Sequence, residues 1–152
     1  MIRSKKRLWL CRGLLIACLA FIWGNSLIPG SGSQALSDGL KLFFGLPLSA
    51  GVLHSGRDLV RKLAHLTEYA ALGWLLGWHT AMDEKKPARA LLPGALCALL
   101  DETIQMFTPN RGPALADVLL YSFGVLLGIT ALHLGHTIYK TIKKNHLEAQ
   151  RQ

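Results

Sequence analysis

Four long apolar runs, separated by short polar segments, constrain this chain more than any other feature. They cover residues 8–28, 59–80, 90–107 and 115–139. A hydrocarbon core of about 30 Å is crossed by about 20 helical residues, and only helices or closed barrels satisfy their backbone groups there. The expected fold class is therefore all-α: a polytopic membrane protein with four transmembrane helices in a compact bundle, as one domain over residues 1–152.

The first run leaves two interpretations open. It follows a basic segment at residues 3–7, and it is interrupted only by Arg12 and by the small polar residues 24–26. Ser31 and Ser33 could serve the cleavage of a signal peptide. Because the run is longer than the apolar segment of a usual signal peptide, an uncleaved membrane anchor is favoured.

Residues 34–50 form a mixed segment between the first two spans. Leu36, Leu40 and Phe43 recur at helical spacing, with Asp38 and Lys41 between them. The segment is too short and too polar to span a bilayer, which predicts a short interfacial helix. A disordered connector is the alternative.

The charge distribution predicts the orientation and excludes one class of function. The 152 residues are 51% hydrophobic with a net charge of +8, but the basic residues stand at the ends of apolar runs and do not interleave with aromatic residues. This pattern argues against nucleic-acid binding. With both termini cytoplasmic, eleven basic residues are inside and five outside, as the positive-inside rule favours. The inner residues are Arg3, Lys5, Lys6, Arg7, Lys85, Lys86, Arg89, Lys140, Lys143, Lys144 and Arg151; the outer ones are Lys41, Arg57, Arg61, Lys62 and Arg111.

Titratable residues open the second span. Lys62, His65, Glu68 and Tyr69 fall on one side of a helix. Ionisable groups cost about 2.5 to 3.5 kcal/mol each in the middle of a membrane on insertion scales, so such a stripe is a functional-site hypothesis.

The predicted orientation brings further polar residues to the same depth, in the outer leaflet. Asp101, Glu102 and Gln105 end the third span, while Asp117 begins the fourth and Arg111 precedes it. Gly73 and Gly77, like Gly124 and Gly128, have the Gly-x-x-x-Gly spacing typical of close helix packing. The candidate ligand-binding residues are Lys62, His65, Glu68, Tyr69, Asp101, Glu102, Gln105, Arg111 and Asp117.

The residues alone leave several chemistries open. Arg111 is the best anion clamp because its planar fork meets phosphate or carboxylate bidentately, with Lys62 as a supporting charge. The candidates for catalysis are His65, Glu68, Glu102 and Asp117. The carboxylates could instead only fix the bundle through ion pairs. A metal centred on His65 and Glu68 is a weaker alternative, so neither a metal nor another cofactor is predicted. The three cysteines lie inside apolar runs and indicate no disulfide framework or zinc finger.

Three ordered motifs over about residues 58–130 resemble those of the VanZ-like family of small bacterial membrane proteins. The motifs are Arg61-Lys62-x-x-His65-x-x-Glu68-Tyr69, Glu102-x-x-Gln105-x-Phe107, and Arg111 with Asp117 and Gly124-x-x-x-Gly128. The resemblance implies a multi-pass protein of the bacterial cytoplasmic membrane, linked to teicoplanin susceptibility and so to antibiotic resistance at the cell envelope. It also supports every candidate ligand-binding residue except Asp101. Where the family commonly has asparagine, four residues after the aspartate, this chain has Tyr121.

Residues and resemblance together predict an outer-leaflet polar cleft that recognises or moves an anionic amphiphile. The expected partners are membrane lipids and a lipid-linked cell-wall precursor or a lipoglycopeptide. The alternatives are a membrane-embedded hydrolase or transferase acting on a lipid phosphate, and a small proton-coupled transporter, whose few helices would require an oligomer.

Overall fold

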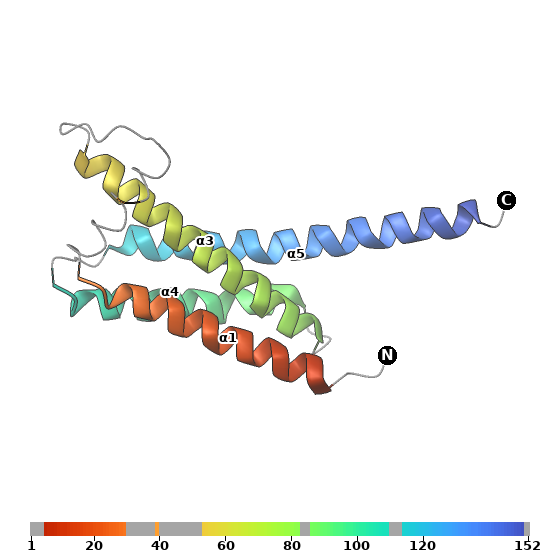
Figure 1. Cartoon of the computed structure of the whole chain (residues 1–152), viewed down its shortest axis with the longest axis horizontal. Helices are drawn as coiled ribbons and strands as arrows, with labels where there is room; N and C mark the ends of the chain where they lie inside the picture. Colours follow the sequence, from red (N-terminus) through yellow and green to blue (C-terminus); the bar gives the residue numbers. More distant parts are fainter. Residues whose placement is uncertain (1–4, 30–38, 40–52, 83–85, 110–113, 151–152) are drawn as a thin grey trace.

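The computed structural model describes residues 5–29, 39, 53–82, 86–109 and 114–150, with only the backbone described for 53–60. Its elements are helix α1 (Lys5–Ser26), helix α3 (Leu53–Met82), the 3-10 helix η1 (Pro87–Ala90), helix α4 (Leu91–Met106) and helix α5 (Leu115–Ala149), as Figure 1 shows. The described residues contain no strand, so the all-α class is confirmed. The predicted interfacial helix at 34–50 lies, apart from residue 39, outside the described residues.

Two of the four predicted spans meet the length and composition that a membrane requires. Among the described residues, α1 and α5 are long and apolar enough to cross a bilayer. Helix α3 has 30 residues but begins with charged ones, and the 16 residues of α4 extend about 24 Å at 1.5 Å per residue. The arrangement of four transmembrane helices therefore stays a prediction.

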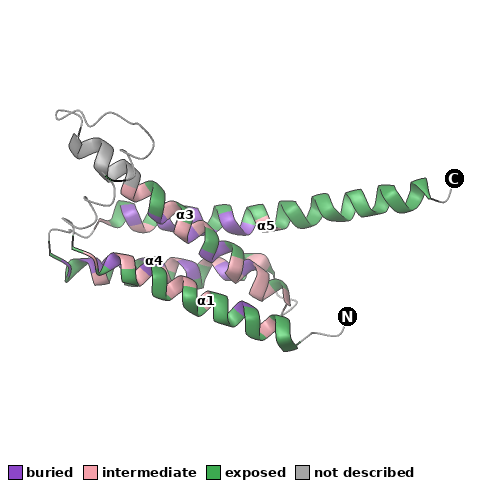
Figure 2. Ribbon diagram, in the orientation of Figure 1, coloured by how far each residue is buried: buried purple, intermediate pink, exposed green. Residues whose placement is uncertain are grey.

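Helix α5 differs from the sequence prediction at its end. The fourth span was predicted to end at residue 139, and the helix itself continues past the basic residues to Ala149. Lysine is a good helix former, neither glycine nor proline follows Gly135, and Lys144 pairs with Glu148 at 3.8 Å one turn later. The basic residues therefore limit the length of α5 that can lie in a membrane, but they do not end the helix. Residues 133–150 are exposed along this arm (Figure 2).

The glycine pairs mark the closest helix contact. Helix α3 packs mainly against α5, and a methyl group on Gly128 would overlap the Ala70 carbonyl oxygen and lie 2.7 Å from the Trp74 amide nitrogen. A methyl group on Gly124 would lie 2.8 Å from the Leu66 carbonyl oxygen. The predicted packing role of these glycines is confirmed, since only glycine leaves room for the two backbones.

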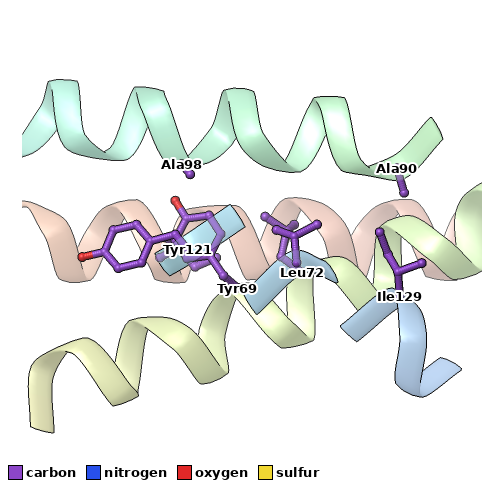
Figure 3. Close-up of a cluster of buried hydrophobic side chains, with 8 residues drawn as sticks. Tyr69, Leu72, Ala90, Ala98, Tyr121 and Ile129 are labelled. Carbon is purple, nitrogen blue, oxygen red and sulfur yellow. The ribbon is translucent and has the colours of Figure 1, made fainter. Parts of the chain in front are cut away.

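The core is a narrow strip between the helices. Tyr69 and Leu72 of α3 meet Tyr121 and Ile129 of α5 (Figure 3). The other members of this cluster are Ile22, Ala90, Ala98 and Val125. Many large apolar side chains instead face outward, including those of Trp9, Ile16, Leu92, Leu119 and Phe123. This inverted pattern suits a protein surrounded by lipid.

Candidate functional site

Buried polar side chains gather where four helix ends meet. The end of α1, the first half of α3, the end of α4 and the start of α5 lie at one end of the bundle, opposite the two chain termini (Figure 1). The polar cluster, as we name it, consists of Asn25, Ser26, His65, Glu68, Asp101, Glu102, Gln105, Thr108 and Asp117. Its members from α3, α4 and α5 meet as the alternating directions of the helices predicted, and α1 adds two more.

Glu68 joins α1 to α3. One of its oxygens, Oε1, accepts a hydrogen bond from the Asn25 amide at 2.7 Å, and Oε2 lies 2.9 Å from Nδ1 of His65. The spacing of His65 and Glu68 by three residues places both on one face of α3. Both carboxylate oxygens therefore have partners, and the His65 ring, which is buried, is held in one orientation.

Gln105 and Thr108 join α4 to the end of α1. The Gln105 amide donates to Asp101 Oδ2 at 3.2 Å and to the Ser26 hydroxyl at 3.5 Å. The Thr108 hydroxyl donates to the Ser26 carbonyl oxygen at 3.0 Å. This carbonyl belongs to the last turn of α1, where backbone acceptors have no partner inside the helix, so Thr108 caps that helix end.

Glu102 connects α4 to α5. Its Oε2 accepts a hydrogen bond at 2.9 Å from the backbone amide of Ala114, the residue that precedes α5. The backbone amide at the start of α5 has no acceptor within that helix, and the Glu102 carboxylate supplies one. The negative charge also interacts favourably with the positive end of the α5 dipole. The contact ties the end of α4 to the start of α5.

Lys62 and Asp117 form an ion pair at the rim of the cluster. Lys62 Nζ lies 3.1 Å from Asp117 Oδ1, in a geometry outside the usual hydrogen-bond angles, and Coulomb attraction does not depend on that angle. The Asp117 side chain is 8% exposed and that of Lys62 is 38% exposed. The cluster therefore presents a cation at its surface and keeps the matching anion inside.

Aromatic rings close the cluster toward the core. Tyr69 and Tyr121 stack with ring centroids 4.9 Å apart and planes within 6°, and the centroid of the His65 ring lies 5.1 Å from that of Tyr121. The Tyr69 hydroxyl donates to the Cys97 carbonyl oxygen at 3.1 Å. Tyr121, the residue that departs from the family pattern, thus contacts the rings of both His65 and Tyr69.

Besides Asp117 Oδ1, which faces Lys62, two further buried carboxylate oxygens have no hydrogen-bond donor among the described residues. They are Oδ1 of Asp101, whose residue is fully buried, and Oε1 of Glu102. Leaving a buried polar atom without a hydrogen bond costs about 1 to 3 kcal/mol of stability. A bound proton or a ligand donor would therefore stabilise the cluster most at these two oxygens.

The structure thus brings together eight of the nine candidate residues, and Arg111 lies outside the described residues. Sequence reasoning missed Asn25, Ser26 and Thr108. The signal for Asn25 and Ser26 was their interruption of an apolar run. Within the described residues, no group of three or more His, Cys, Asp or Glu side chains is arranged to hold a metal ion.

The fold and the cluster define a class: a small all-α membrane protein whose helices meet in a buried polar cluster at one end. A family model described as VanZ/LLP1 matches residues 13–138, and the chain belongs to this family. The resemblance inferred from the motifs is confirmed. Comparisons with curated proteins and with solved structures gave no match.

Proposed function

We propose that the polar cluster is the recognition site for an anionic amphiphile, which the protein binds or moves at the outer leaflet. The observation that carries this proposal is the position of Lys62, a half-exposed cation held by the buried Asp117. The neighbouring Leu63 is 50% exposed, and Leu119 on α5 is 72% exposed. A fixed cation beside lipid-facing apolar surface suits a ligand with an anionic head group and an apolar tail.

The charges inside the cluster restrict where such a head group binds. Glu68, Asp101, Glu102 and Asp117 are carboxylates, and their interior would repel an anion. The head group therefore binds at the rim, where Lys62 is accessible, and Asp117 acts as a positioning residue for that lysine. Arg111 precedes α5 by a few residues and stays the second cation of the proposal from its place in the sequence.

The side of the membrane that the polar cluster faces narrows the class of ligand. With both termini cytoplasmic, as the basic residues favour, the polar cluster faces the outer leaflet of the bacterial cytoplasmic membrane. Lipid-linked envelope precursors and lipoglycopeptides such as teicoplanin are anionic amphiphiles available at that face. Reporter fusions in the loop around Arg111 test this orientation, and a cytoplasmic position of that loop would refute it.

Native mass spectrometry of the purified full chain, titrated with a polyprenyl phosphate, tests the proposal. We expect Lys62→Gln and Arg111→Ala each to weaken binding about tenfold, because each loses a charge-assisted hydrogen bond. Lys86→Gln is the matched control, since it removes the same charge from an exposed position at the opposite end of the bundle. Equal binding by wild type and Lys62→Gln, or an equal loss in the control, would contradict the proposal.

A proton-coupled role is the second candidate, and one observation favours it. Oδ1 of Asp101 and Oε1 of Glu102 are buried without a donor among the described residues. Uptake of a proton at either carboxylate would relieve the cost of a buried charge. In this form of the proposal, binding of the amphiphile at Lys62 and protonation of the interior are linked through Asp117 and Glu102.

A further inference from the structure

A cavity of about 430 Å³ lies at the opposite end of the bundle from the polar cluster. The start of α1, the end of α3, η1 and the middle of α5 surround it. It extends from the buried Gly77 and Ile129, through Trp78, outward to Arg7 and His136 at the exposed end. The cavity is therefore apolar inside and basic at its mouth.

Among the described residues, none that lines this cavity is acidic. Among the ion pairs of the described residues, none involves Arg7, His133 or His136. A concave site with an arginine at its mouth attracts anions, and the arginine fork matches the oxygens of a phosphate group.

The cavity lies between two helices whose described residues do not pack directly against each other. Within the described residues α1 packs against α3 and α4 but not against α5. Arg7 comes from α1, whereas His133 and His136 come from α5. A ligand that contacts all three side chains would therefore join two helices that do not touch each other.

We propose that this cavity binds an anionic phospholipid, with the head-group phosphate at Arg7, His133 and His136 and the start of an acyl chain against Trp78 and Leu132. Tryptophan is suited to this place because its amphipathic ring prefers the membrane interface. Basic pockets between helices on the cytoplasmic side bind anionic head groups. The assignment to the cytoplasmic leaflet depends on the proposed orientation, but the binding does not.

This site is separate from the amphiphile site. His65 of the polar cluster and Trp78 of the cavity are 13 residues apart on α3, which is about 20 Å along the helix axis. Lys62→Gln should therefore keep the preference for an anionic phospholipid that depends on Arg7. Failure of one proposal can be distinguished from failure of the other.

The test is a lipid titration of the delipidated full chain in detergent, followed by native mass spectrometry. We expect phosphatidylglycerol to bind about tenfold more tightly than phosphatidylethanolamine with the same chains, and Arg7→Gln to remove this preference. Lys6→Gln is the matched control, because Lys6 is the exposed neighbour on α1 and does not line the cavity. It should keep the preference. Ala81→Phe keeps every charge but narrows the cavity, so it should weaken the binding of both lipids.

Thermal stability is the second measurement. Phosphatidylglycerol should raise the melting temperature of wild type and Lys6→Gln, because the lipid joins α1 to α5, and should not raise that of Arg7→Gln. Equal binding of the two lipids, or equal losses in Arg7→Gln and Lys6→Gln, would overturn the proposal. Displacement of the lipid by millimolar inorganic phosphate would also overturn it, in favour of a site for free phosphate.

Discussion

Gly128 is the position where one methyl group should disturb the whole bundle. At this point of the α3–α5 contact, the added methyl of Gly128→Ala would overlap the Ala70 carbonyl oxygen and approach the Trp74 amide nitrogen to 2.7 Å. Both are backbone atoms of a helix and cannot rotate away. The helices must therefore separate by on the order of 1 Å, which weakens dispersion contacts along the largest helix interface.

We expect Gly128→Ala to lower the free energy of unfolding by about 2 to 3 kcal/mol, at the upper end of the cost of overpacking. The measurement is reversible unfolding in mixed micelles with increasing dodecyl sulfate, followed by helix content. Gly135→Ala is the control on the same helix, where an added methyl meets no atom within 4 Å. It should be neutral, or stabilising by up to about 1 kcal/mol through helix propensity.

Alanine at Gly124 and at Gly77 should destabilise the protein less than alanine at Gly128. A methyl group on Gly124 would lie 2.8 Å from a carbonyl oxygen, whereas one on Gly77 would meet only a side-chain carbon at 3.1 Å. The cost should therefore fall from Gly128→Ala through Gly124→Ala to Gly77→Ala. Stability of Gly128→Ala equal to that of Gly135→Ala would refute the close approach of α3 and α5.

Two other predictions concern the polar end of the bundle. Tyr69→Phe removes the hydroxyl that donates to the Cys97 carbonyl but keeps the stack on Tyr121, so it should cost about 1 kcal/mol in the same unfolding assay. Tyr139→Phe, on the exposed arm of α5, should cost nothing, and equal losses in the two variants would argue against the buried hydrogen bond. If binding is proton-coupled, polyprenyl phosphate should bind to wild type with uptake of about one proton, measured by calorimetry in buffers of different ionisation enthalpy. Glu102→Gln keeps the acceptor for Ala114 and should abolish that uptake, and unchanged uptake would remove Glu102 from the second candidate function.

The sequence by itself determined the helical class and which ends of the helices carry polar residues. Apolar runs of spanning length require helices, because the backbone must satisfy its own hydrogen bonds in lipid. Short connections reverse the chain direction at each turn. The end of α4 and the first halves of α3 and α5 were therefore expected to meet. They do, because Glu102 of α4 accepts a hydrogen bond from Ala114 before α5, and Lys62 of α3 pairs with Asp117 of α5. The motifs also identified the family, which the match over residues 13–138 confirms.

Only the tertiary structure decided which polar groups are partners. The pairing of Glu68 with Asn25 depends on how α1 is rotated against α3, and no spacing within one helix fixes that rotation. The same holds for the pairing of Lys62 with Asp117, since their helices cross at an angle set by the glycine contacts. Helical periodicity fixes the face of a residue on its own helix, but the partner it meets follows from the rotation and crossing of two helices, which are properties of the packed bundle.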